Sequence, residues 1–255
     1  MNVAVTGGGS GIGRAVADHF ARTGANVTIG DIDGSDVALD VSDRDSFAAF
    51  LDAAEERHGP LDVLVNNAGV DWVGPFHEEP DEVSRREIDI NLMGTILGTR
   101  LALARMLPRG KGHIVNVASG VGRVPLPGSA VYSATKHGIV GLTESLRLEY
   151  RDSGVRFSLI QPAQVDTGML AGLARPKLLP VVSADDVAAA VVRAVRQNRF
   201  ELWVPASQGV TARLGYVMPR RLRELVMRVL GVGRIAGDAD LAERRAYHER
   251  SFGRS

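Results

Sequence analysis

The sequence predicts a single α/β domain with a doubly wound parallel sheet, covered by helices on both faces in three α/β/α layers. Short apolar segments recur along the first 205 residues, and helical segments separate them. The first apolar segment runs directly into a glycine-rich loop that opens a helix. Polar residues gather at the ends of the apolar segments, where such sheets bind ligands. Residues 206–255 are expected to form a helical extension packed on the same domain.

The composition excludes several kinds of partner and site. The chain has 255 residues, and its formal net charge of zero predicts no nucleic-acid partner. It has no cysteine, which excludes disulfides and thiol nucleophiles, and its six histidines lack metal-ligand spacing, so we expect no metal. No apolar run reaches the ~18 residues of a membrane span, and the chain opens directly into a strand. We therefore expect a cytoplasmic protein.

The first strand, 2–6, leads into the glycine-rich loop and then into a helix that runs to about residue 23. Free backbone N–H groups and the positive end of the helix dipole would face a phosphate there. Glycine runs are often only turns, but this one stands at the first strand–helix junction, where Rossmann-type folds bind dinucleotides. The residues expected to bind the cofactor are Gly7, Gly9, Ser10, Gly11, Ile12 and Gly13.

Asp31 ends the second predicted strand, 27–30, and indicates which dinucleotide binds. It stands 18 residues after Gly13, where a carboxylate can accept hydrogen bonds from the adenosine ribose and would repel a 2′-phosphate. No lysine or arginine precedes Gly11 in the loop or directly follows Asp31, so the sequence favours NAD over NADP. The alternative is that Asp31 only forms the turn before Gly34.

The next segments continue the alternation of strands and helices. Residues 37–41 predict a third strand, and only eight residues separate Asp31 from Asp40, too few for a helical crossover. We expect an amphipathic helix over 42–58, with Ser42 as its N-cap.

Amide and small residues follow the fourth predicted strand, 61–65. Asn67, Ala68 and Gly69 would let a cofactor approach the backbone closely, although such residues are also common in turns. A largely helical segment over 81–107 contains Asn91. An asparagine on the inward side of a helix holds a buried polar partner or a water molecule.

The fifth strand, around 114–117, leads into the chemically richest part of the sequence. It ends at Ser119, and a Gly/Pro-rich loop then opens a helix near Tyr132 that continues to about residue 151. Tyr132 and Lys136 are four residues apart, so they share a helical face. A neighbouring ammonium favours the phenolate, so we expect the pKa of Tyr132 to lie below its usual ~10. Ser119 could hold a carbonyl or alcohol oxygen while the proton moves.

The domain is expected to end with the same alternation. The remaining elements are a sixth strand over 155–160, an apolar loop or short helix over 168–182, a helix over 184–197 capped by Ser183, and a final strand over 200–204.

In this order and spacing, the motifs resemble those of the short-chain dehydrogenase/reductase family over about residues 2–205. The family's Thr-Gly-x-x-x-Gly-x-Gly loop matches Thr6–Gly13, and its Asn-Asn-Ala-Gly motif matches Asn66–Gly69. The resemblance implies the catalytic set Asn91, Ser119, Tyr132 and Lys136. In that set the tyrosine exchanges the proton of the substrate oxygen and the serine positions this oxygen. The lysine lowers the tyrosine pKa and holds the nicotinamide ribose, and the asparagine holds a relay water.

The resemblance also extends the expected cofactor site. It places Asp40 and Val41 at the adenine, Tyr132 and Lys136 at the ribose, Pro162 and Val165 at the nicotinamide, and Thr167 at the pyrophosphate. The sequence departs from the family at Pro162-Ala163, where Pro-Gly is usual, and in the short segment after Asp31. The first departure changes the backbone near the nicotinamide, and the second leaves the adenosine side more open.

The function implied is NAD-dependent interconversion of an apolar secondary alcohol and its ketone by hydride transfer. A 3-oxoacyl-thioester reductase is an alternative that Asp31 disfavours, because biosynthetic reduction usually draws on NADPH. A non-catalytic dinucleotide sensor is a second alternative. A sensor would have no need of all four catalytic residues, which this chain retains.

The last fifty residues exceed a minimal member of the family. Residues 219–230 predict a helix with Pro219 first and one apolar face, which contains Leu222, Leu225, Val226, Val229 and Leu230. Residues 213–234 hold six arginines and one glutamate. This segment could cover the substrate mouth, lie on an anionic membrane or contact another subunit. We expect a homodimer or homotetramer, and a helix with a frayed tail over 238–255.

Overall fold

The computed structural model describes residues 1–173, 181–229 and 241–252. The strands are β1 Asn2–Thr6, β2 Asn26–Asp31, β3 Val37–Ala38, β4 Val63–Asn66, β5 Gly112–Val117, β6 Val155–Pro162, β7 Gln164–Val165, β8 Val181–Val182 and β9 Glu201–Val204. The helices are α1 Gly11–Arg22, α2 Arg44–His58, α3 Asp81–Glu87, α4 Gly94–Met106, α5 Ala130–Glu149, α6 Ala184–Gln197, α7 Ala206–Val217, α8 Arg220–Val229 and α10 Leu241–Phe252. A π-helical turn, Ile88–Met93, joins α3 to α4.

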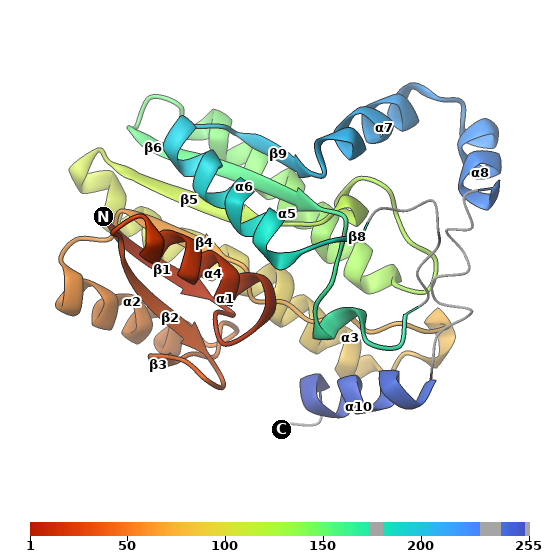
Figure 1. Ribbon diagram of the computed structural model, residues 1–255, viewed down its shortest axis with the longest axis horizontal. Coiled ribbons are helices and arrows are strands. Elements are labelled where there is room, and N and C mark those ends of the chain that lie inside the picture. The colour runs from red at the N-terminus through yellow and green to blue at the C-terminus, as the bar shows by residue number, and fades with distance from the viewer. Residues whose placement is uncertain (174–180, 230–240, 253–255) are drawn as a thin grey trace.

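Seven strands form one parallel sheet in the order β3-β2-β1-β4-β5-β6-β9, and helices cover both of its faces (Figure 1). The predicted doubly wound α/β fold is therefore confirmed. From β1 the chain winds outward to β2 and β3, and it then returns to β4 and winds outward in the other direction. This reversal between β1 and β4 creates the crevice in which sheets of this kind bind ligands.

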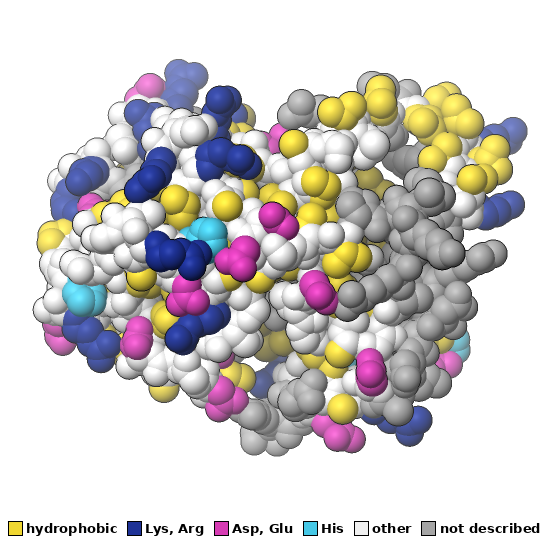
Figure 2. Space-filling view, viewed as in Figure 1, with side chains coloured by type: hydrophobic (Ala, Val, Ile, Leu, Met, Phe, Trp, Pro, Cys, Tyr) yellow, Lys and Arg dark blue, Asp and Glu magenta, His cyan; other side chains and the backbone are white. Residues whose placement is uncertain are grey.

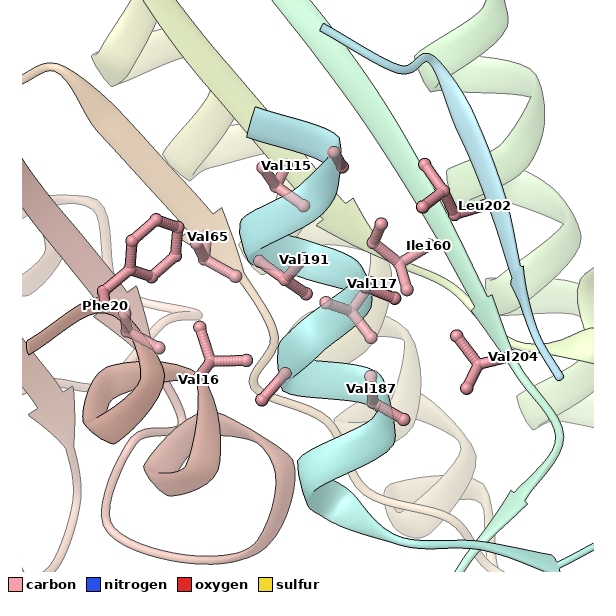
Figure 3. Close-up of a cluster of buried hydrophobic side chains, with 14 of the residues drawn as sticks. Val16, Phe20, Val65, Val115, Val117, Ile160, Val187, Val191, Leu202 and Val204 are labelled. Carbon is pink, nitrogen blue, oxygen red and sulfur yellow. The ribbon is translucent and has the colours of Figure 1, made fainter. Parts of the chain in front are cut away.

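The two faces of the sheet carry separate hydrophobic cores, because successive side chains of a strand point to opposite faces. On one face, Val65 and Val115 pack with α1 and with Val187 and Val191 of α6 (Figure 3). On the other face, Leu64 and the rest of that core pack with α2 and α4. Burial on both faces explains why these strands read as continuous apolar runs in the sequence.

Several predicted boundaries need correction. No helix joins β2 to β3, as expected, but β3 is limited to Val37–Ala38. The N-cap of α2 is Asp43 and not Ser42, since the Asp43 carboxylate accepts the backbone N–H groups at positions 45 and 46. Ser42 instead donates its hydroxyl to Asp40 Oδ1 at 2.6 Å. By contrast, the Ser183 cap of α6 is confirmed as a full capping box with Asp186.

The C-terminal segments extend past β9 in three described helices. Helix α7 was not predicted from the sequence, and α8 begins at Arg220, so Pro219 precedes the helix. Helix α10 packs on the segment that follows β4, where His248 stacks on Trp72. Predictions for 174–180, 230–240 and 253–255, including Leu230, lie outside the described residues, and the domain division at residue 205 stays a prediction. Within the described parts, no helix is both long and apolar enough to cross a membrane.

Candidate active site

A cavity of about 850 Å³ opens along the carboxyl ends of β1, β4, β5 and β6. It brings together most of the residues that the sequence singled out. The predicted site residues that line it are Gly7, Ser10, Gly11, Ile12, Asp31, Asp40, Val41, Asn67, Ala68, Gly69, Ser119, Tyr132, Pro162, Val165 and Thr167. Four predicted site residues do not line the cavity: Gly9, Gly13, Asn91 and Lys136.

The glycine-rich loop is packed against the end of β4. Gly7 has a φ of +65°, and a Cβ there would lie 2.7 Å from the Ala68 Cα, so a larger residue cannot be accommodated. The Asn67 amide donates to the carbonyls of Thr6 at 3.1 Å and Gly7 at 3.2 Å, which holds the loop in place. The side chain of Ser10 does not cap α1, so the N-terminus of this helix is open toward an anion. This geometry fits a pyrophosphate.

Asp31 connects the end of β2 to the same loop. Its Oδ2 accepts the N–H of Gly9 at 2.8 Å, and it lines the cavity. A Cβ on Gly9 would lie 2.3 Å from the Asp33 carbonyl oxygen, so the loop and β2 can meet only with glycine at this position. Asp31 therefore orders the loop and places a carboxylate on the side expected for adenosine.

Ser119 and Tyr132 line the cavity, and Lys136 lies beside Tyr132. The Lys136 ammonium lies 5.4 Å from the centre of the Tyr132 ring and donates to the Val117 carbonyl at 3.2 Å. The Ser119 hydroxyl lies close enough to the Tyr132 phenol to favour its ionised form. A hydroxyl, a phenol and an ammonium in this arrangement can hold a substrate oxygen and exchange a proton with it.

The predicted pKa of Tyr132 is wrong for this structure. Burial raises its pKa well above the ordinary value, and the carboxyl groups of Asp71 and Glu87 raise it further, along with Tyr247. The Ser119 hydroxyl lowers the pKa of Tyr132 and has the smallest of these effects. Burial also lowers the pKa of Lys136 to about 8, although Asp71 and Glu87 favour its charged form. Tyr132 is thus a proton donor in this state.

Asn91 lies in the π-helical turn, a feature that often marks a functional site. Its Oδ1 accepts the N–H of Val70 at 2.8 Å, and its Nδ2 donates to the Val70 carbonyl at 2.8 Å and to the Thr135 hydroxyl at 3.3 Å. The buried polar partner expected from the sequence is therefore the backbone that follows Gly69. Asn91 fixes this segment against α5.

A buried group of charged residues beside Tyr132 was missed in the sequence. Asp71 lies on the cavity wall, and burial raises its pKa to about 7. Burial raises the pKa of Glu87 to about 9, and Glu87 accepts the N–H of Trp72 at 2.8 Å. Arg244 and Tyr247 reach the same region from α10. No motif signals this group, because its members lie as far apart as residues 71 and 247.

The residues at the cavity fit a nicotinamide dinucleotide. The open N-terminus of α1 suits a pyrophosphate, Asp31 suits a ribose diol, and the Tyr132–Lys136 pair lies where the reacting end of the cofactor would be. Among the described residues, no group of three or more His, Asp or Glu side chains is arranged to hold a metal ion.

Comparisons with known proteins agree with this geometry. The family model of the short chain dehydrogenases matches residues 1–177. Cis-4-hydroxycyclohexanecarboxylate dehydrogenase of Sinomonas cyclohexanicum is 42% identical over 186 residues, which cover 66% of this chain and 75% of the relative. 1-Deoxy-11-beta-hydroxypentalenate dehydrogenase of Streptomyces exfoliatus is 37% identical over 222 residues, which cover 78% of this chain and 81% of that protein.

A solved structure extends the comparison to three dimensions. The crystal structure of a short chain dehydrogenase/reductase from Burkholderia phymatum in complex with NAD matches with a TM-score of 0.75 and 30% identity. The match covers 84% of this chain and 92% of that one. The residues matched by the family model include strands β1 to β7 and the positions of Asn91, Ser119, Tyr132 and Lys136.

Proposed function

This chain belongs to the short-chain dehydrogenase/reductase family as an oxidoreductase that acts on CH–OH groups, and we propose on that premise that it interconverts an apolar secondary alcohol and its ketone with NAD. The convergence of Ser119, Tyr132 and Lys136 at the cavity supports this proposal most strongly. Above them the cavity wall is largely apolar, and its apolar residues include Val121, Val124, Leu126, Leu170 and Leu173. A substrate with one reacting oxygen on an apolar skeleton matches such a wall.

The proposed mechanism assigns one task to each polar side chain. Tyr132 exchanges its proton with the substrate oxygen, and the Ser119 hydroxyl holds that oxygen in place. Lys136 stabilises the phenolate through its positive charge and binds the nicotinamide ribose. Asn91 orders the chain beside the site and holds the relay water between Lys136 and solvent. The bound cofactor supplies the hydride acceptor or donor.

The raised pKa of Tyr132 bears on the direction of proton transfer. A buried, protonated phenol is ready to act as the acid that completes ketone reduction. Alcohol oxidation requires the phenolate, so it depends more strongly on the charge of Lys136.

The proposal is tested by following the absorbance of the reduced nicotinamide with NAD or NADP. The panel contains alicyclic, steroid and long-chain secondary alcohols together with hydroxyacyl thioesters. We expect turnover with NAD and an alicyclic or steroid alcohol. No turnover across the panel, in a protein that binds NADH by fluorescence, would instead support the non-catalytic sensor.

We propose NAD as the preferred cofactor because of Asp31. In an Asp31→Asn variant the side chain keeps its size but loses the charge that repels a 2′-phosphate. We expect the preference for NAD over NADP, measured as a ratio of kcat/KM values, to fall about 10-fold or more, since a hydrogen bond to a charged group contributes about 1.5–3 kcal/mol. Asp33→Asn, two residues further on and outside the cavity lining, is the matched control. Unchanged preference in the Asp31 variant would contradict this assignment.

We propose that α7 and α8 cover the substrate mouth and that the exposed apolar side chains beside the mouth contact an anionic membrane. Leu214, Met218 and Val226 line the cavity, whereas Leu222 and Val229 are exposed. Figure 2 shows hydrophobic side chains gathered over these helices, with basic side chains at the rim. Apolar side chains bordered by arginine are typical of helices that bind the surface of an anionic bilayer. We further propose that the protein is cytoplasmic with a peripheral membrane contact.

The membrane contact predicts co-sedimentation with vesicles that contain phosphatidylserine, and none with purely zwitterionic vesicles. A Leu225→Asp/Val229→Asp double variant should lose this binding, because it places carboxylates at the exposed apolar positions. Leu148→Asp, at an exposed leucine of α5, should retain it.

Sedimentation without vesicles also tests the proposed homodimer or homotetramer. If the double variant has a lower molecular mass in solution than the unchanged protein and Leu148→Asp, the apolar face of α8 is a subunit contact.

A further inference from the structure

Helix α10 reaches the active site from a distant part of the sequence. Tyr247 and Ser251 of this helix line the cavity. Arg244, on the same helix, is only 2% exposed and is the largest of the fully buried side chains. An arginine is rarely buried without specific partners, so the contacts of this side chain indicate its role.

Arg244 joins two separate segments of the cavity wall. Its Nη1 donates to the Met169 carbonyl at 2.7 Å, and its Nη2 donates to the Asp71 carbonyl at 2.5 Å. Met169 belongs to the turn after β7, and Asp71 follows the backbone that Asn91 fixes. Because both acceptors are main-chain carbonyls, the guanidinium sets the distance between the two segments rather than recognising their side chains.

The rest of α10 strengthens this connection. The Tyr247 hydroxyl accepts the N–H of Asp71 at 3.3 Å, and the guanidinium lies 4.4 Å from the centre of the Tyr247 ring. His248 stacks on Trp72 with 5.9 Å between the ring centres. Asp71 and Trp72 are thus held by three side chains of one helix, Arg244, Tyr247 and His248.

The guanidinium also faces the carboxyl group of Asp71. Nη2 lies 3.7 Å from Asp71 Oδ2. The other groups that influence this carboxyl are the hydroxyl of Ser129, the ammonium of Lys136 and the carboxylate of Glu79, while Asp71 itself acts on Glu87. Among the groups that lower the pKa of Asp71, Arg244 has the largest effect.

We propose that Arg244 is a positioning residue for the substrate. It holds the 70–72 segment and the turn at Met169 at the separation that an apolar ketone or alcohol requires. The inference rests on the proposed function, since it assigns these two segments to the substrate wall. It places the determinant of substrate binding in the C-terminal extension, outside the Ser119, Tyr132 and Lys136 group.

The test compares Arg244→Met, Arg244→Lys and the control Arg245→Met, which alters an exposed arginine of the same helix. The ligand is decalone, an apolar bicyclic ketone. Its binding to the NADH-loaded protein is measured by the quenching of tryptophan fluorescence. All variants also carry Trp203→Phe. Trp72 is then the only tryptophan, so the signal arises beside α10. Circular dichroism and NADH affinity establish that each variant is folded.

We expect decalone to bind about 10- to 100-fold more weakly to Arg244→Met, because two charge-assisted hydrogen bonds are lost, with NADH affinity unchanged. Arg244→Lys should recover part of the loss, and Arg245→Met should bind like the unchanged protein. Any change in decalone affinity that follows the ionisation of Asp71 should occur at a higher pH in Arg244→Met, since the cation that favours ionised Asp71 is gone. Arg244→Lys keeps the cation and should therefore leave this pH close to that of the unchanged protein.

Equal decalone affinity in a folded Arg244→Met variant would overturn the inference. So would an equal loss of decalone and NADH affinity, which would indicate a general loss of structure. If decalone binding follows the expected order but no alcohol is turned over, the proposed function fails while the positioning role stands.

Discussion

Replacing Tyr132 with phenylalanine is expected to lower kcat by about 100- to 10,000-fold, the range that a positioned general acid or base contributes. The variant removes one oxygen and keeps the ring beside which Lys136 lies. NADH affinity should therefore change far less than kcat. The measurement is steady-state turnover with the best alcohol and with its ketone, together with NADH binding by fluorescence.

The structure allows a sharper comparison with Ser119. Ser119→Ala should also reduce kcat, since it removes the hydroxyl that favours ionised Tyr132 and that would hold the substrate oxygen. It leaves the phenol in place, so some activity should survive. If Tyr132→Phe retains most of the activity that the unchanged protein has, the proton comes from another group and the proposed mechanism is rejected.

The sequence predicts those parts of the site that depend on short-range spacing. A glycine loop between a strand and a helix, and a tyrosine four residues before a lysine, fix their own local geometry. The parallel sheet follows from the same alternation and brings Asn67, Ser119 and the loop to one edge. Each of these predictions rests on residues that are close together in the chain or at equivalent strand ends.

The pKa of Tyr132 shows what such reasoning cannot reach. Spacing identifies Lys136 as a neighbour, but it does not show that burial dominates or that the carboxyl groups of Asp71 and Glu87 lie nearby and raise the pKa of Tyr132 further. Asp71 stands in a loop, and Glu87 falls inside the predicted helical segment 81–107, where it looks like an ordinary charged residue. Asp71 is held in place by α10, which packs from the other end of the chain. Tertiary packing therefore decides the electrostatics of the site.

Lys136→Met provides the second large effect, because it removes the only charge proposed to stabilise the phenolate. We expect kcat for alcohol oxidation to fall by about 100-fold or more, comparable with the loss of a catalytic proton-transfer group. Ketone reduction should fall less, since Tyr132 is already protonated.

In the unchanged protein the pKa of Lys136 is about 8, so its cation is present below that pH and lost above it. A contribution of the cation to oxidation should therefore diminish as the pH rises through about 8, and Lys136→Met should lack this dependence.

The same substitution also has a signature in stability that is independent of turnover. Folding lowers the pKa of Lys136 from 10.5 to about 8, so the folded state disfavours the charged lysine. The contribution of this group to stability should consequently rise with pH between about 8 and 10.5 and stay constant below 8. Urea unfolding across this range should show the rise in the unchanged protein and not in Lys136→Met. If both proteins show the same rise, burial does not lower the pKa of Lys136 to about 8, and the pH dependence proposed for alcohol oxidation fails with it.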